Sequence, residues 1–111
     1  MAAVRTSRFA AGSTNLTSEV TIYTVPSGKR ALVRGVNYVN NRSGASVGYL
    51  GVRAPGGALV GVDESSSVPS FGGVRFDPWM VANAGDSLTI TAPSGSGDFF
   101  FTVAGVLFDL P

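Results

Sequence analysis

The sequence predicts an all-β domain, a two-sheet antiparallel β-sandwich that is jelly-roll-like and built from seven to eight short strands. Val, Thr, Ser and Gly are abundant while Leu, Glu, Lys and Gln are scarce, a composition typical of sheets. No segment carries helical spacing over eleven residues. Turn signals in which Pro is followed by Gly separate short β-rich runs, at 26–28, 55–57, 69–73 and 93–95.

The first strand is predicted at 19–25, where Val20 and Ile22 alternate with polar neighbours. The second is predicted at 30–40, and its apolar positions change parity at Gly35, which indicates a β-bulge or bend. Polar residues with a Gly at 40–44 predict a turn. The next strands are predicted at 46–53 and 58–62.

A polar, Gly-rich loop is predicted at 63–73. The segment 74–81 is ambiguous because Pro78 cannot donate to a central ladder, so it marks an edge, a bulge or a short turn. A turn is predicted at 83–86. Strands are then predicted at 87–92, where Leu88 and Ile90 face inward, and at 99–110.

The length of 111 residues supports one domain, predicted at 15–111. Residues 1–14 are small, polar and weakly patterned, so we expect a loose arm that can add a strand to a neighbour's sheet. No stretch is long and apolar enough to predict a membrane span, and no secretory signal is recognisable. Synthesis in a cytoplasm is therefore expected.

The composition disfavours most enzymatic chemistry. The chain has no Cys and no His, which removes thiolate and imidazole metal ligands and the usual general base. Asp63 and Glu64 are adjacent and point apart on an extended chain, and Ser65–Ser67 has no base to activate it. We expect no enzyme activity, catalytic residue, metal or cofactor. A net charge of +1 gives no case for nucleic acid.

Aromatic and basic side chains are the candidates for binding. Trp79 is interpreted as a core residue in preference to an interface or sugar-stacking aromatic. In the run Phe99–Phe101, Phe100 must face the opposite side from its neighbours, toward a second layer or another subunit, unless the strand is buried on both sides. Seven of the eight basic residues are Arg, which suits desolvated interfaces but also fits a GC-rich coding sequence. The predicted interface residues are Arg5, Arg8, Phe9, Phe71, Trp79 and Phe100.

Two motifs carry a family resemblance. One is Ile22-Tyr23-Thr24-Val25-Pro26-Ser27-Gly28-Lys29-Arg30, continuing to Asn40, and the other runs from Trp79 through Asn83-Ala84-Gly85-Asp86-Ser87-Leu88. Together they resemble small β-sandwich virion proteins of tailed bacteriophages, of the head-decoration, minor capsid or minor tail type. The resemblance covers about residues 21–90 and implies a sandwich fold, a place in the virion and no catalytic residues.

The expected function is therefore a non-enzymatic decoration or minor capsid protein that binds and stabilises the capsid exterior. The expected partners are major capsid or tail proteins and further copies of the chain, for example in a trimer, without nucleic acid or membrane. The alternative is a minor tail protein or adhesin module that recognises a host-surface glycan. Tyr49, Phe71 and Trp79 would then form the contact.

Overall fold

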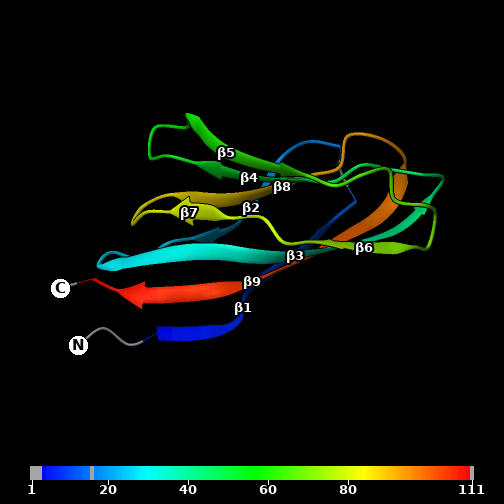
Figure 1. Cartoon of the computed structure of the whole chain (residues 1–111). Coiled ribbons are helices and arrows are strands. Elements are labelled where there is room, and N and C mark those ends of the chain that lie inside the picture. The colour runs from blue at the N-terminus through cyan, green and yellow to red at the C-terminus, as the bar shows by residue number, and fades with distance from the viewer. Residues whose placement is uncertain (1–3, 16, 111) are drawn as a thin grey trace.

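The computed structural model describes residues 4–15 and 17–110, with side chains from residue 10 onward within these ranges. This part of the chain contains no helix that could cross a membrane. It forms nine strands (Figure 1). They are β1 (Val4–Thr14), β2 (Val20–Thr24), β3 (Lys29–Ser43), β4 (Tyr49–Arg53), β5 (Leu59–Glu64), β6 (Gly73–Phe76), β7 (Met80–Ala82), β8 (Ser87–Thr91) and β9 (Ser96–Asp109).

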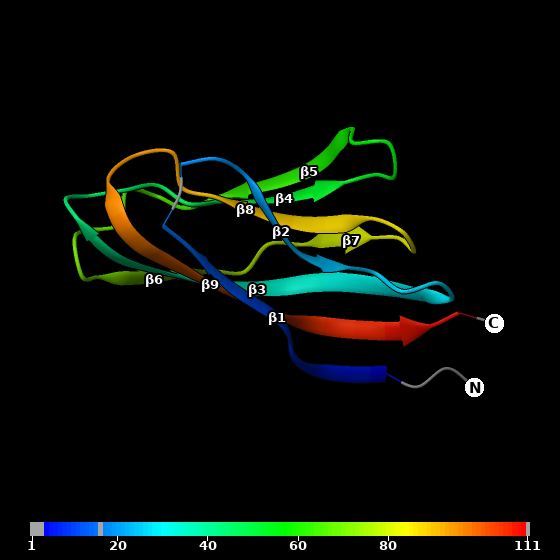
Figure 2. The ribbon, with the colours of Figure 1, turned by 180° about the vertical axis from the view of Figure 1, so that it is seen from behind.

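The strands form two antiparallel sheets that pack into a sandwich, which confirms the predicted fold class (Figures 1 and 2). The first sheet has the order β1-β9-β3-β6, with β7 also paired to β3, and the second sheet has the order β2-β8-β4-β5. β6 and β7 pair with successive parts of β3, so they act as one strand interrupted at 77–79. Counted that way, the topology is that of an eight-stranded jelly roll.

Two strands extend beyond their predicted bounds of 30–40 and 99–110. β3 has 15 residues and β9 has 14, and they pair from Lys29 opposite Asp109 to Ser43 opposite Ser96. The turn predicted at 40–44 is wrong because β3 continues through most of this segment. The side chain of Asn40 faces inward and donates to the carbonyls of Gly44 and Val68, which satisfies a polar group that sequence alone assigns to a turn.

The bulge predicted at Gly35 is confirmed. The β3–β9 register shifts between Val33 and Gly35, so Arg34 is the extra residue on β3. Gly105 faces this bulge, and a Cβ there would lie only 1.9 Å from the carbonyl oxygen of Leu32. The two backbones therefore approach more closely than any side chain at position 105 would allow.

The core lies between the sheets and is built on the alternation of β9. Phe99 and Phe101 are buried and pack against the ring of Tyr38 at centroid distances of 6.5 and 5.4 Å. Burying each such aromatic contributes about 1.5–3 kcal/mol to folding. Phe100 points to the other side and stays 37% exposed, which confirms its predicted orientation and excludes a strand buried on both faces here.

Residues 4–14 do not form a loose arm. As β1 they pair with β9 of the same chain, from Val4 opposite Phe108 to Thr14 opposite Phe99. Without β1, the long edge of β9 would present a row of unpaired backbone donors and acceptors. The weakly patterned sequence of 4–14 does not predict this strand, because main-chain hydrogen bonds to β9 do not need alternating apolar residues.

Candidate functional site

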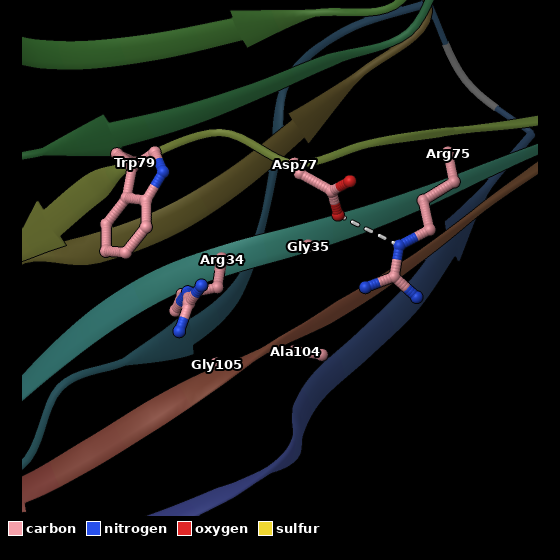
Figure 3. A pocket seen from close by; sticks show the side chains of 7 residues that line it. All are labelled: Arg34, Gly35, Arg75, Asp77, Trp79, Ala104 and Gly105. Carbon is pink, nitrogen blue, oxygen red and sulfur yellow. Dashed lines mark hydrogen bonds and ion pairs between the residues drawn. The ribbon is translucent and has the colours of Figure 1, made fainter.

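Irregularities on both sides of β3 open a hollow of about 390 Å³ on the outer face of the first sheet (Figure 3). On one side, the bulge shifts β3 against β9 at Arg34. On the other side, the connection at 77–79 interrupts pairing because Pro78 lacks an amide donor. The segment 74–81, left ambiguous by the sequence, thus contains two short strands and a break. The hollow is lined by Arg34, Gly35, Arg75, Asp77, Trp79, Ala104 and Gly105.

Small residues form the floor of this hollow and give its charged side chains room. A Cβ on Gly35 would lie 2.6 Å from Nη2 of Arg75, so Gly35 lets that guanidinium cross the strand. Ala104 and Gly105 of β9 supply little or no side chain beside it. Figure 3 shows the Arg34 and Arg75 guanidinium groups on opposite sides of the hollow, with Gly35 and Ala104 between them.

The two guanidinium groups are held by different contacts. Arg34 lies over the ring of Trp79, with 4.2 Å between its Cζ atom and the ring centroid, in a cation–π contact. Arg75 donates from Nε to the carboxylate of Asp77 at 3.0 Å. Trp79 is 69% exposed, so its interpretation as a core residue is wrong. The two Arg and one Asp leave the hollow with a formal charge of +1.

A second hollow of about 210 Å³ lies on the outer face of the second sheet. Tyr49, Leu59 and Thr89 line it together with Glu19 and Arg53, which form a bidentate ion pair at 2.6 and 2.8 Å. Hydrogen bonds from Arg53 and Thr89 lower the pKa of Glu19. Tyr49 and Trp79 therefore line different hollows on opposite sheets and do not form the single contact proposed for a glycan.

Three exposed apolar side chains lie at the end of the first sheet where β6 begins. Val39 and Phe100 lie directly opposite each other on β3 and β9, and they are 40% and 37% exposed. Phe71 is 76% exposed on the turn that leads into β6, whose first residue Gly73 pairs with Val39. We call Val39, Phe71 and Phe100 the apolar end of the first sheet. The side chains of Arg5, Arg8 and Phe9, also predicted for an interface, lie outside the described residues.

The other candidate reactive groups have structural partners. Ser65 is buried, accepts from the amide of Gly48 and donates to the carbonyl of Ser66. The carboxylate of Asp63 accepts from the hydroxyl of Tyr38. In the described part of the chain, no three Asp, Glu, His or Cys side chains gather as a metal site would require.

Sequence reasoning missed Arg42, a fully buried side chain at the end of β3. It donates from Nε to the carbonyl of Gly97 at 2.9 Å, and from Nη1 to the carbonyls of Ala92 and Ser94. Burial lowers the pKa of Arg42, while the charge of Asp98 acts in the opposite direction. A usable signal existed, because Arg42 has the same parity as the inward-facing Tyr38. Arg34 and Arg75 were also missed as site residues.

Comparisons with known proteins show a shared fold and no family. No family model matches the chain, and no curated protein matches it. A solved structure described as Bacillus endospore appendages, a family of disulfide-linked pili, matches with a TM-score of 0.50 at 14% identity over 100% of this chain and 92% of that one.

Viral proteins also appear among the similar structures. A chain from infectious bursal disease virus, Gt strain, matches with a TM-score of 0.49 at 11% identity over 96% of this chain. The VP2 protein of that virus, in derived T=1 particles, matches with a TM-score of 0.49 at 9% identity. This chain spans 31% of the length of each. Because no family model and no curated protein matches, the predicted tailed-bacteriophage family stays a resemblance of motifs.

Proposed function

We propose that the chain is a non-enzymatic structural protein of a tailed-bacteriophage virion, which decorates and stabilises the capsid exterior as a homo-oligomer. The two sequence motifs support this role, and the jelly roll fits it. The observation that carries the proposal is the apolar end of the first sheet. There Phe71, Val39 and Phe100 are 76%, 40% and 37% exposed, and apolar side chains that lie together on a surface are typical of contact sites.

The backbone at Phe71 supports the same reading. Phe71 has a φ of 57° in a turn closed by the hydrogen bond from the Gly72 amide to the Pro69 carbonyl. This left-handed conformation favours Gly or Asn and is uncommon for a bulky residue. Strained backbone of this kind clusters at functional sites. The turn is anchored by Ser70, which donates to the carbonyl of Arg42 at 2.6 Å.

Sedimentation velocity and particle binding test the proposal. We expect the wild-type protein to associate with itself or with shells that lack it, and we expect Phe100→Ser to weaken this association at least tenfold without unfolding the protein. Val62→Ser is the matched control, because Val62 is 55% exposed on the second sheet. If both variants lose association to the same extent, or if neither loses it, the apolar end is not an interface.

The stabilising role has its own experiment. Virions that lack the protein are heated beside wild-type virions, and DNA release is followed with a dye that does not enter intact capsids. We expect release at a lower temperature without the protein. The same release temperature, or a wild-type virion that contains no copy of this chain, would overturn the proposal.

A further inference from the structure

The hollow on the first sheet holds hydrogen-bond donors that the fold itself does not use. Within the described residues, Arg34 contacts the Trp79 ring and donates no hydrogen bond. Arg75 donates from Nε to Asp77, and its two Nη groups donate to no described residue. Both guanidinium groups face one open space (Figure 3).

Each of these exposed side chains has one contact that favours its orientation in the absence of a ligand. The Trp79 ring orients Arg34, and Asp77 orients Arg75. Gly35 leaves the space that Nη2 of Arg75 occupies. Guanidinium groups bind carboxylates through paired hydrogen bonds, and preorganised side chains lose less conformational entropy on binding. The arrangement therefore suits an anion of single charge, which would balance the +1 of the two Arg and Asp77.

We propose that this hollow binds a carboxylate-bearing saccharide, such as a uronic acid residue. The carboxylate lies between Arg34 and Arg75. Asp77 supplies an acceptor for sugar hydroxyls, whereas a bare carboxylate ligand would meet only repulsion from it. Arg34 lies over one face of the Trp79 ring, and the rest of this residue, which is 69% exposed, offers an apolar surface for the sugar ring. The volume of about 390 Å³ lies in the range of small-ligand sites.

This site goes beyond the proposed assembly role and does not depend on it. Its lining residues do not include Val39, Phe71 or Phe100. The sequence-based alternative placed a glycan on Tyr49, Phe71 and Trp79. The site proposed here shares only Trp79 with that alternative and adds Arg34, Arg75 and Asp77. An oligomer that fails to bind sugar would refute the site alone, and a sugar-binding monomer would refute the assembly alone.

Tryptophan fluorescence gives a direct test, because Trp79 is the only Trp in the chain. The protein is titrated with methyl glucuronide and, separately, with methyl glucoside, which lacks the carboxylate. We expect saturable binding of the glucuronide with a Kd on the order of 1 mM and at least tenfold weaker binding of the glucoside. NMR shifts of the Gly35 and Gly105 amides provide a second measurement if the fluorescence does not change.

Variants separate the site from nonspecific charge. Arg34→Ala and Arg75→Ala each lower glucuronide affinity at least tenfold. Arg30→Ala leaves it unchanged, because Arg30 is exposed on the same strand outside the hollow and donates to Asn83. The proposal is overturned if neither measurement detects glucuronide, or if Arg30→Ala costs as much as Arg34→Ala. It is also overturned if acetate or a Glu-rich peptide binds as tightly as the glucuronide. That result would indicate a site for the carboxylate side chains of a partner protein.

Discussion

The hydroxyl of Tyr38 donates a hydrogen bond to the carboxylate of Asp63 and so joins the two sheets at their interior. Tyr38 is a fully buried residue of β3, and Asp63 lies on β5 at the edge of the second sheet. Burial, followed by the hydrogen bond and charge of Asp63, raises the pKa of Tyr38 far above its usual range. This contact ties an edge strand to the centre of the core.

Replacing Tyr38 with Phe removes the donor and keeps the ring. We expect a loss of about 1–3 kcal/mol in the free energy of unfolding, because the half-buried carboxylate of Asp63 loses its partner. Urea unfolding measures this change. In a double-mutant cycle with Asp63→Ala, we expect a coupling energy of at least 0.5 kcal/mol. A coupling near zero would show that the hydrogen bond contributes nothing.

The same pair makes stability depend on alkaline pH. In the unfolded chain a Tyr ionises near pH 10, whereas in the folded protein Tyr38 stays protonated well above that value. Its contribution is therefore complete below about pH 10 and is lost as the pH rises further, by about 1.4 kcal/mol per unit. The stability difference between wild type and Tyr38→Phe should shrink above pH 10. A constant difference from pH 8 to 11 would refute the raised pKa.

Arg42 is expected to stabilise the fold strongly. Its guanidinium connects the end of β3 to the carbonyls of Ala92, Ser94 and Gly97 in the β8–β9 segment. Arg42→Ala removes the donor from all three carbonyls, of which that of Ala92 is buried, and opens a cavity where the buried Arg42 side chain lay, so we expect a loss of about 3–5 kcal/mol.

Two variants show whether geometry or charge matters at this position. Arg42→Lys keeps the charge, but its compact ammonium cannot reach all these carbonyls, so an intermediate loss is expected. Arg34→Ala is the exposed control and should change the unfolding free energy by no more than about 1 kcal/mol, the size of an exposed cation–π contact. If Arg42→Ala and Arg34→Ala have equal effects in urea, the buried network does not stabilise the fold.

The features that sequence predicted correctly depend on local chemistry. The outward face of Phe100 follows from alternation and the bulge from Gly35, whereas Pro78 indicated only an irregularity in 74–81 and left its form open. Each needs only a residue and its immediate neighbours. The all-β class follows from propensity and turn signals in the same way.

The missed features depend on register between distant segments. The hollow brings together Arg34, Arg75 and Trp79 from β3, β6 and the connection before β7, which sequence spacing cannot align. β1 pairs with the edge of β9, a contact between segments about 90 residues apart that local sequence does not reveal. Trp79 is exposed because the strand break places it at the rim of the first sheet, whereas a lone Trp in a continuous strand is usually buried.

Gly105 tests the close approach of β3 and β9. A Cβ at this position would lie 1.9 Å from the backbone oxygen of Leu32, so Gly105→Ala must push apart the two longest strands. We expect a loss of about 3 kcal/mol or more, or failure to fold. Gly61→Ala is the matched control, because the nearest atom to its Cβ is 3.7 Å away. The control should keep or slightly increase the melting temperature. Similar melting temperatures for both variants would contradict the steric account.

The variant Phe71→Gly should change the stability of the protein and its self-association in opposite directions. Phe71→Gly relieves the positive φ of 57° and removes an exposed aromatic side chain, so the isolated protein should gain about 1 kcal/mol of stability. The same change removes part of the apolar end of the first sheet, and association in sedimentation velocity should weaken at least tenfold. A variant that is more stable and associates less is what a residue retained for its contacts should produce. If association is unchanged while stability rises, the strained Phe71 has no role in the interface, and the apolar end is reduced to Val39 and Phe100.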